Sequence, residues 1–285
     1  MILVTGATGK VGRQVVAALK QRRAEFCVTS RDPKKAAETL GSDIAVVVAD
    51  YARAESLKVA MTGVDHLFLL CGPNERKAEL EIGMVDAAKA AGVRHVVKLS
   101  VYGADERSRA TVMRDHRRVE QYIETQGFEW THLRPNLFMQ HFLNHAAAIK
   151  GEGVIHAPLA KSRVSVVDTR DIGAVAAVAL TEPGHVGRAY ELTGPAAPTY
   201  DEIAALFSRL LDRPIRYENI TAEDAHRLMR AAGSAEWHAT VLGEIYAFFR
   251  NGEGARVSDA IQRVTGRPAR SMEDFVRDHI VQFRA

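Results

Sequence analysis

The stretch Ile2-Leu-Val-Thr-Gly-Ala-Thr-Gly-Lys-Val-Gly12 decides the fold, because an apolar run breaks into glycines at positions 6, 9 and 12 and residues 13–19 then continue as a helix. A strand, a glycine-rich turn and a helix in this order are typical of a loop that binds a dinucleotide pyrophosphate. Gly6 allows a sharp turn, Gly9 allows backbone N–H groups to approach the phosphates, and Gly12 allows the helix to pack on the strand. The helix N-terminus then faces the anion.

The length and the net charge of the chain limit the classes of protein to which it can belong. The 285 residues are enough for one doubly wound sheet and an appended lobe. The 38 Lys and Arg residues against 35 Asp and Glu residues leave a net charge of +3, which is too close to balance for a surface that binds nucleic acid or membrane. We therefore expect a small-molecule partner, no nucleic acid, no membrane, and a monomer or a homodimer.

The chain is expected to be cytoplasmic. Its first strand begins at residue 2 without a basic and hydrophobic leader, and no apolar run approaches the roughly 20 residues that a membrane helix needs. Cys27 and Cys71, the only cysteines, each lie in an apolar strand-like run. This setting predicts small buried thiols rather than a metal or redox site.

Apolar, strand-like runs recur along the first half of the chain, and segments with helical spacing separate most of them. This alternation predicts an α/β Rossmann fold, a doubly wound parallel sheet with crossover helices. The expected strands are residues 2–5, 25–30, 44–49, 65–71, 94–100 and 128–133.

Several helix ends are readable in the sequence. Asp32-Pro33 is an N-cap followed by a proline at the first helical position, and Gly92 closes a helix. Thr199-x-x-Glu202 matches the capping box, and Ser271-x-x-Asp274 is a near variant of it. These motifs predict helices that start at about residues 33, 200 and 272.

Glycine and proline become frequent after about residue 150 and punctuate shorter elements. We therefore predict an NAD(P)-binding domain at 1–150 and a smaller substrate-binding lobe at 151–285. A strand and a helix within 164–180 are expected to return to the first domain.

The residues after the second expected strand bear on the choice of dinucleotide. An acidic residue about 20 positions beyond the glycine loop binds the ribose 2′-OH of NAD, and Asp32 stands there. Asp32 nevertheless precedes Pro33, which places its carboxylate to cap the next helix, whereas Arg31 ends the strand itself. Arg31, with Lys34 and Lys35, is suited to pair with a 2′-phosphate, a solvated surface charge being the alternative. We therefore expect NADP(H) in preference to NAD(H).

Ligands of such folds lie at the carboxyl ends of the strands, so the residues that follow each strand are expected to line a cleft. Asp50 and Tyr51 should lie near the adenine. Ser100 and Tyr102 should lie where nicotinamide and substrate meet, and both are catalytic candidates because their hydroxyls are suited to donate to a substrate carbonyl. The expected cofactor-binding residues are Gly6, Thr8, Gly9, Lys10, Val11, Gly12, Arg31, Lys35, Asp50, Tyr51, Cys71, Gly72, Pro73, Ser100, Pro135 and Asn136.

Several segments resemble the NmrA-like family of atypical short-chain dehydrogenase/reductases. They are Thr5-Gly-Ala-Thr-Gly-Lys-Val-Gly12, Ser30-Arg-Asp-Pro-Lys34, Ala49-Asp-Tyr51 and Leu133-Arg-Pro-Asn-Leu-Phe-Met139, with shorter likenesses at 190–195 and 264–268. The resemblance implies an NADP(H)-binding fold. The family contains reductases of quinones, dyes and plant phenolics as well as proteins that only sense the redox state of the nucleotide.

The usual catalytic pair of the wider superfamily, Tyr-x-x-x-Lys, is missing, because none of the seven tyrosines has a lysine four residues later. Alignment of Glu124-Thr-Gln-Gly127 with the similar helix end of benzylic-ether and isoflavone reductases places His116 where those enzymes carry a catalytic lysine. The resemblance makes His116 the first catalytic candidate, with Glu120 one turn on to orient it. The alternative for His116 is an exposed helical residue among arginines.

His141 and His145 are spaced i, i+4, but neither a third ligand nor the glutamate of a zinc-protease helix accompanies them, so no metal is expected. We expect instead an NADPH-dependent oxidoreductase that reduces a quinone, an enone or another conjugated carbonyl compound, because such acceptors take their proton from weak acids or water. The alternative is a non-catalytic NADP(H)-sensing regulator of the NmrA type, which the missing Tyr-Lys pair favours.

Overall fold

The computed structural model describes residues 1–284, and a parallel sheet of seven strands forms its centre. Their order is β3-β2-β1-β4-β5-β6-β8, of which the first six match the doubly wound dinucleotide-binding fold. The predicted α/β fold and its six expected strands are confirmed. The strands are β1 (Ile2–Val4), β2 (Phe26–Ser30), β3 (Val46–Val48), β4 (His66–Leu69), β5 (His95–Leu99), β6 (Glu129–Pro135) and β8 (Arg188–Leu192).

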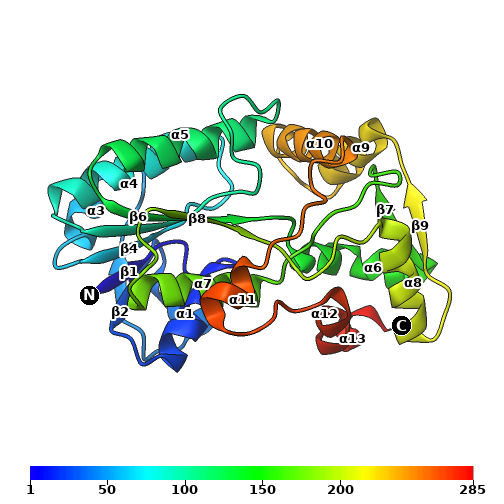
Figure 1. Cartoon of the computed structure of the whole chain (residues 1–285), viewed down its shortest axis with the longest axis horizontal. Coiled ribbons are helices and arrows are strands. Elements are labelled where there is room, and N and C mark those ends of the chain that lie inside the picture. Colours follow the sequence, from blue (N-terminus) through cyan, green and yellow to red (C-terminus); the bar gives the residue numbers. More distant parts are fainter. Residues whose placement is uncertain (285) are drawn as a thin grey trace.

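Helices cover both faces of the sheet (Figure 1). Each face has its own apolar core, with Leu19 and Val175 buried on one side and Met84 and Val119 on the other. Burying each such side chain contributes about 1.5–3 kcal/mol. One layer contains α3 (Ala54–Ala60), α4 (Lys77–Ala90) and α5 (Thr111–Thr125), the other contains α1 (Gly12–Gln21), α7 (Thr169–Thr181) and α11 (Ala260–Thr265), and α2 (Pro33–Leu40) joins β2 to β3.

A smaller lobe lies beyond the carboxyl ends of the strands (Figure 1). Phe142, Phe207 and Phe275 are buried in its core. Among the described residues, no helix is both long enough and apolar enough to cross a bilayer. The elements of the lobe are the 3-10 helix η1 (Met139–His145), α6 (Ala146–Glu152), β7 (Val154–Ala157), α8 (Tyr200–Leu211), β9 (Arg216–Asn219), α9 (Ala222–Ala231), α10 (Glu236–Arg250), α12 (Met272–Asp278) and α13 (Ile280–Phe283), with β7 and β9 paired in parallel.

The predicted helix ends are confirmed. The Asp32 carboxylate accepts a hydrogen bond from the backbone N–H of Lys35 at 3.1 Å, and Pro33 opens α2. Gly92 follows α4 with φ +78°, a left-handed conformation that glycine adopts without strain. Thr199 and Ser271 both form complete capping boxes.

The chain crosses between the two parts more than once. Helix α7 packs closely on α1. The two helices approach at Gly173, where an added Cβ would lie only 2.6 Å from Gln14 Cβ. The expected strand before α7 is reduced to a single bridge between Val167 and Phe138. Beyond 164–180, strand β8 also joins the main sheet, next to β6. Only one residue of β8, Leu192, is fully buried, so the strand lacks the apolar run that marks the other six.

Candidate functional site

A cleft of about 2070 Å³ lies at the carboxyl ends of β1 to β6 and extends under α9 and α10 of the lobe. All the expected cofactor-binding residues line it except Gly12, and so do the three catalytic candidates Ser100, Tyr102 and His116. The fold thus brings together side chains from loops that are far apart in the sequence.

The glycine loop has no room for side chains at two of its three glycines. Gly6 has φ +62°, and a Cβ there would lie 2.8 Å from the carbonyl oxygen of Leu70. A Cβ at Gly12 would lie 2.7 Å from Ala7 Cα and closer still to the Gly6 carbonyl oxygen. Gly12 therefore packs against the backbone of Gly6 and Ala7 and does not line the cleft.

Backbone donors of the loop remain available for an anion. The Gly9 N–H donates to the Gly6 carbonyl at 3.0 Å, which holds the loop in shape. Within residues 1–284, the N–H groups of Lys10 and Val11, two residues that line the cleft, have no acceptor. Together with the N-terminus of α1, these donors fit a pyrophosphate.

Arg31 and Lys35 form the positive end of the cleft beside β2. Both side chains line it, and neither forms an ion pair with any carboxylate of residues 1–284. Asp32 is committed to the cap of α2. Lys34, which was expected to assist Arg31, does not line the cleft. Two cations without acidic partners at this position fit a phosphate on the adenosine ribose.

Tyr51 and Cys71 line the cleft with uncharged side chains. The Tyr51 hydroxyl accepts a hydrogen bond from the Gly6 N–H at 2.9 Å, and burial raises the pKa of this phenol. Burial and the nearby Glu81 raise the pKa of the Cys71 thiol to about 11. Cys71 and Cys27 are both free and buried, as expected for small packing residues.

Ser100 is linked to Glu120, and this corrects one expectation. The Ser100 hydroxyl donates to Glu120 Oε1 at 2.6 Å, so it presents a lone pair and not a proton to the cleft. Glu120 also accepts hydrogen bonds from Arg134 and Arg117. The prediction that Glu120 orients His116 is therefore wrong, because its carboxylate is occupied by Ser100 and two guanidinium groups.

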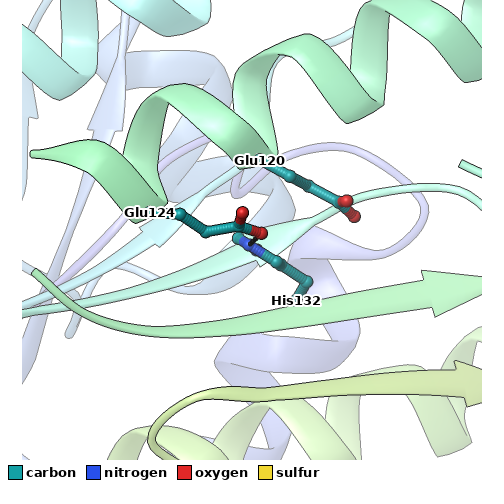
Figure 2. Close-up of side chains that lie close together, drawn as sticks. All are labelled: Glu120, Glu124 and His132. Carbon is teal, nitrogen blue, oxygen red and sulfur yellow. Dashed lines mark hydrogen bonds and ion pairs between the residues drawn. The ribbon is translucent and has the colours of Figure 1, made fainter. Parts of the chain in front are cut away.

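Glu120, Glu124 and His132 lie within 4.8 Å of one another through their ligand-type atoms, and Figure 2 shows both glutamates reaching from α5 towards β6. Arg117 bridges the two carboxylates, with distances of 2.9 Å to Glu120 and 2.7 Å to Glu124. Arg134 pairs with Glu120 from the other side. The guanidinium groups already neutralise both carboxylates, so the cluster is an ion-pair network that fixes α5 on β6.

His141 and His145 both line the cleft and lie outside this cluster. Burial lowers the pKa of each to about 4, so both rings are neutral at physiological pH. They belong to an aromatic wall that also contains Phe142, Trp237 and Tyr246. This end of the cleft is suited to a flat, uncharged compound.

His116 is buried and is not the exposed helical residue of the alternative interpretation, with 5% of its surface exposed. Its Nε2 lies 2.9 Å from Lys77 Nζ and its Nδ1 lies 3.1 Å from Lys98 Nζ. Lys98 pairs with Glu81 at 2.7 Å, and both side chains are fully buried. Sequence reasoning missed Lys77, Lys98 and Glu81, although a lysine inside the apolar strand 95–99 was a readable signal.

Asn136 and Tyr102 contact α10 and the segment that follows it. The Asn136 amide donates to Ser165 Oγ and to the Gly254 carbonyl, so it ties β6 to this segment. Tyr102 is buried and packs edge-on against Phe248 of α10. Both residues line the cleft, and contacts within the protein occupy the Asn136 side-chain amide.

Comparison with known proteins identifies relatives over the full length. Residues 1–272 match the NmrA-like family. The chain is 37% identical over 285 residues to an NAD(P)H azoreductase of Xenophilus azovorans, covering 100% of both chains. It is 38% identical to a (4-alkanoyl-5-oxo-2,5-dihydrofuran-3-yl)methyl phosphate reductase of Streptomyces griseus, covering 99% of both. The solved structure of the NADPH-dependent quinone oxidoreductase QOR2 of Escherichia coli in complex with NADPH superposes with a TM-score of 0.90 at 26% identity, covering 98% of this chain and 100% of that one.

Proposed function

Since the chain belongs to the NmrA-like family, we propose that it is an NADPH-dependent oxidoreductase that reduces a quinone, an enone or another conjugated carbonyl compound. The relatives support this class of reaction. One is a quinone oxidoreductase, and the substrate named for another contains a 5-oxo-2,5-dihydrofuran, which is a conjugated unsaturated lactone.

The observation that carries the proposal is the continuity of the cleft. One end of the cleft has the unpaired N–H groups of the glycine loop and the cations Arg31 and Lys35. The other end is lined by aromatic, uncharged side chains. Ser100, Tyr102 and the buried His116 cluster lie along the same cavity. A nucleotide and a planar acceptor can therefore occupy one cavity beside a set of titratable side chains.

NADPH, when bound, supplies a hydride. The glycine-loop N–H groups would hold its pyrophosphate, and Arg31 and Lys35 would hold its 2′-phosphate. The residues after β4 to β6, among them Gly72 and Pro135, would hold the nicotinamide end. The cleft residues would also exclude water from the acceptor, which prevents loss of the hydride to side reactions.

Turnover is tested by the loss of the reduced-nicotinamide absorbance with a panel of acceptors. We expect reduction of quinones and enones, with no reduction of isolated ketones, because only a conjugated acceptor delocalises the charge that the hydride adds. Tight NADPH binding with no turnover on any acceptor would contradict the proposal. That result would support the non-catalytic NADP(H)-sensing regulator instead.

The choice of cofactor gives a second prediction. Replacing Arg31 by alanine should weaken NADPH binding by about 1–3 kcal/mol, because a charge-assisted hydrogen bond to the 2′-phosphate is lost. NADH binding should barely change, since NADH has no such phosphate. The measurement is calorimetry with both nucleotides.

Lys34→Ala is the matched control, because Lys34 is a neighbouring cation that does not line the cleft. It should leave the affinity for both nucleotides unchanged. Equal losses for NADPH and NADH in Arg31→Ala would overturn the assignment of NADP(H).

A further inference from the structure

Lys98 is a charged lysine with no contact to solvent, and its hydrogen bonds account for all three of its protons. They point to Glu81 Oε2 at 2.7 Å, to the Leu99 carbonyl at 3.2 Å and to His116 Nδ1 at 3.1 Å. An ammonium group has three N–H donors and no acceptor. His116 Nδ1 must therefore carry a lone pair that faces Lys98.

This contact determines the protonation state of the other ring nitrogen of His116. A neutral imidazole has one N–H and one lone pair, so Nε2 carries the proton and faces Lys77 Nζ at 2.9 Å. A hydrogen bond at this distance requires a lone pair on Lys77. Lys77 is therefore an uncharged amine in the resting protein.

The opposite assignment, with Lys77 charged and Lys98 neutral, is disfavoured. It would move the cation that pairs with the fully buried Glu81 carboxylate from Lys98 Nζ at 2.7 Å to Lys77 Nζ at 3.8 Å, and the longer distance weakens the ion pair. The charged and titratable groups around Lys77 are Glu81 at 3.8 Å, Lys98, Cys71, Asp115 and His116. Burial is the main cause that lowers the pKa of Lys77, and burial and both lysines lower the pKa of His116.

We propose that Lys98, His116 and Lys77 form a proton relay that ends in the cleft, with Lys77 as the group that touches the acceptor. Lys77 is the first residue of α4, lines the cleft and has 22% of its side-chain surface exposed, whereas both nitrogens of His116 face lysines. The inference rests on the proposed reductase function and supplies the acid that the missing Tyr-x-x-x-Lys pair would have provided.

When the acceptor takes a hydride, a new C–H bond forms and the electron pair of its π system moves to oxygen. Lys98 gives a proton to Nδ1 of His116, the Nε2 proton of His116 passes to the Lys77 amine, and the Lys77 ammonium so formed gives a proton to that oxygen. Lys98 becomes an amine and His116 changes tautomer. A proton from water then returns through Lys77 and His116 to Lys98.

The first test does not depend on activity. Nitrogen-15 NMR of the histidine rings of the wild-type protein at pH 7, with His116 assigned by its absence in His116→Ala, should show a protonated Nε2 and an unprotonated Nδ1. A His116 ring with the reverse tautomer, or with both nitrogens protonated, would overturn the relay.

The second test compares two acceptors. Lys77→Met should lower the turnover of an enone by about 100-fold, the usual contribution of a general acid. It should leave the turnover of a triarylmethyl cation nearly unchanged, because this cation takes a hydride and needs no proton. Lys89→Met, on the exposed part of the same helix, should change neither.

The outcomes separate the two proposals. Equal losses on both acceptors in Lys77→Met would assign Lys77 to binding or packing and would overturn the relay alone. Full enone turnover in Lys77→Met would do the same. A wild-type protein that binds NADPH and reduces neither acceptor would overturn the reductase function, and the relay as its acid would fall with it.

Discussion

Replacing Gly12 by alanine is expected to weaken NADPH binding by at least about 100-fold, which is about 2.8 kcal/mol. The added Cβ would lie 2.7 Å from Ala7 Cα and closer still to the Gly6 carbonyl, and both atoms are backbone that cannot rotate away. The start of α1 must therefore move, and the N–H groups of Lys10 and Val11 move with it. The same overpacking should destabilise the fold by about 1–3 kcal/mol. Calorimetry and thermal unfolding measure the two effects.

Gly83→Ala is the matched control for this substitution. Gly83 lies inside α4, and a Cβ there would meet nothing within 4 Å. The change should leave NADPH binding intact and stabilise the fold by up to about 1 kcal/mol, because glycine is a poor helix former. Normal NADPH affinity in Gly12→Ala would show that the loop tolerates movement of α1.

The centre of the sheet was predictable from the sequence because its inner strands are buried on both faces. Strands such as Ile2–Val4 therefore appear as continuous apolar runs, and Gly6 and Asp32 mark the turns beside the strands. Strand β8 was not predictable in this way. It lies at the edge of the sheet, where Arg188 and Ala189 are exposed and no apolar run is needed.

The lining of the cleft was also predictable, since it follows from the carboxyl ends of the strands. The hydrogen-bond partners within it were not. Ser100 and Asn136 line the cleft as expected. Ser100, which follows β5, nevertheless donates to Glu120 of α5, and Asn136 donates to Gly254, which is 118 residues away. Such contacts depend on tertiary packing, which local sequence patterns do not encode.

The buried cluster around His116 was not predictable from local sequence patterns either. Lys77, Glu81 and Lys98 come from α4 and β5, and their spacing in the sequence matches no known motif. Only the parallel pairing of β4 with β5 and the packing of α4 on α5 bring them to His116. A lysine within a buried strand was a sign of a polar partner, yet it did not reveal which one.

His116→Ala is expected to lower turnover by about 100-fold or more and to leave NADPH affinity nearly intact. The substitution removes the ring that joins Lys98 to Lys77, whereas the glycine loop and Arg31 are untouched. Steady-state kinetics with an enone and calorimetry with NADPH measure the two quantities.

Arg118→Ala, an exposed change on the same helix, is the control for His116→Ala and should leave turnover unchanged. Imidazole added to His116→Ala should restore part of the turnover, because it can occupy the vacated space and bridge the two amines, whereas a purely structural loss would not respond. Unchanged turnover in His116→Ala would reject His116. It would transfer the role of proton donor to Tyr102, whose phenol also lines the cleft.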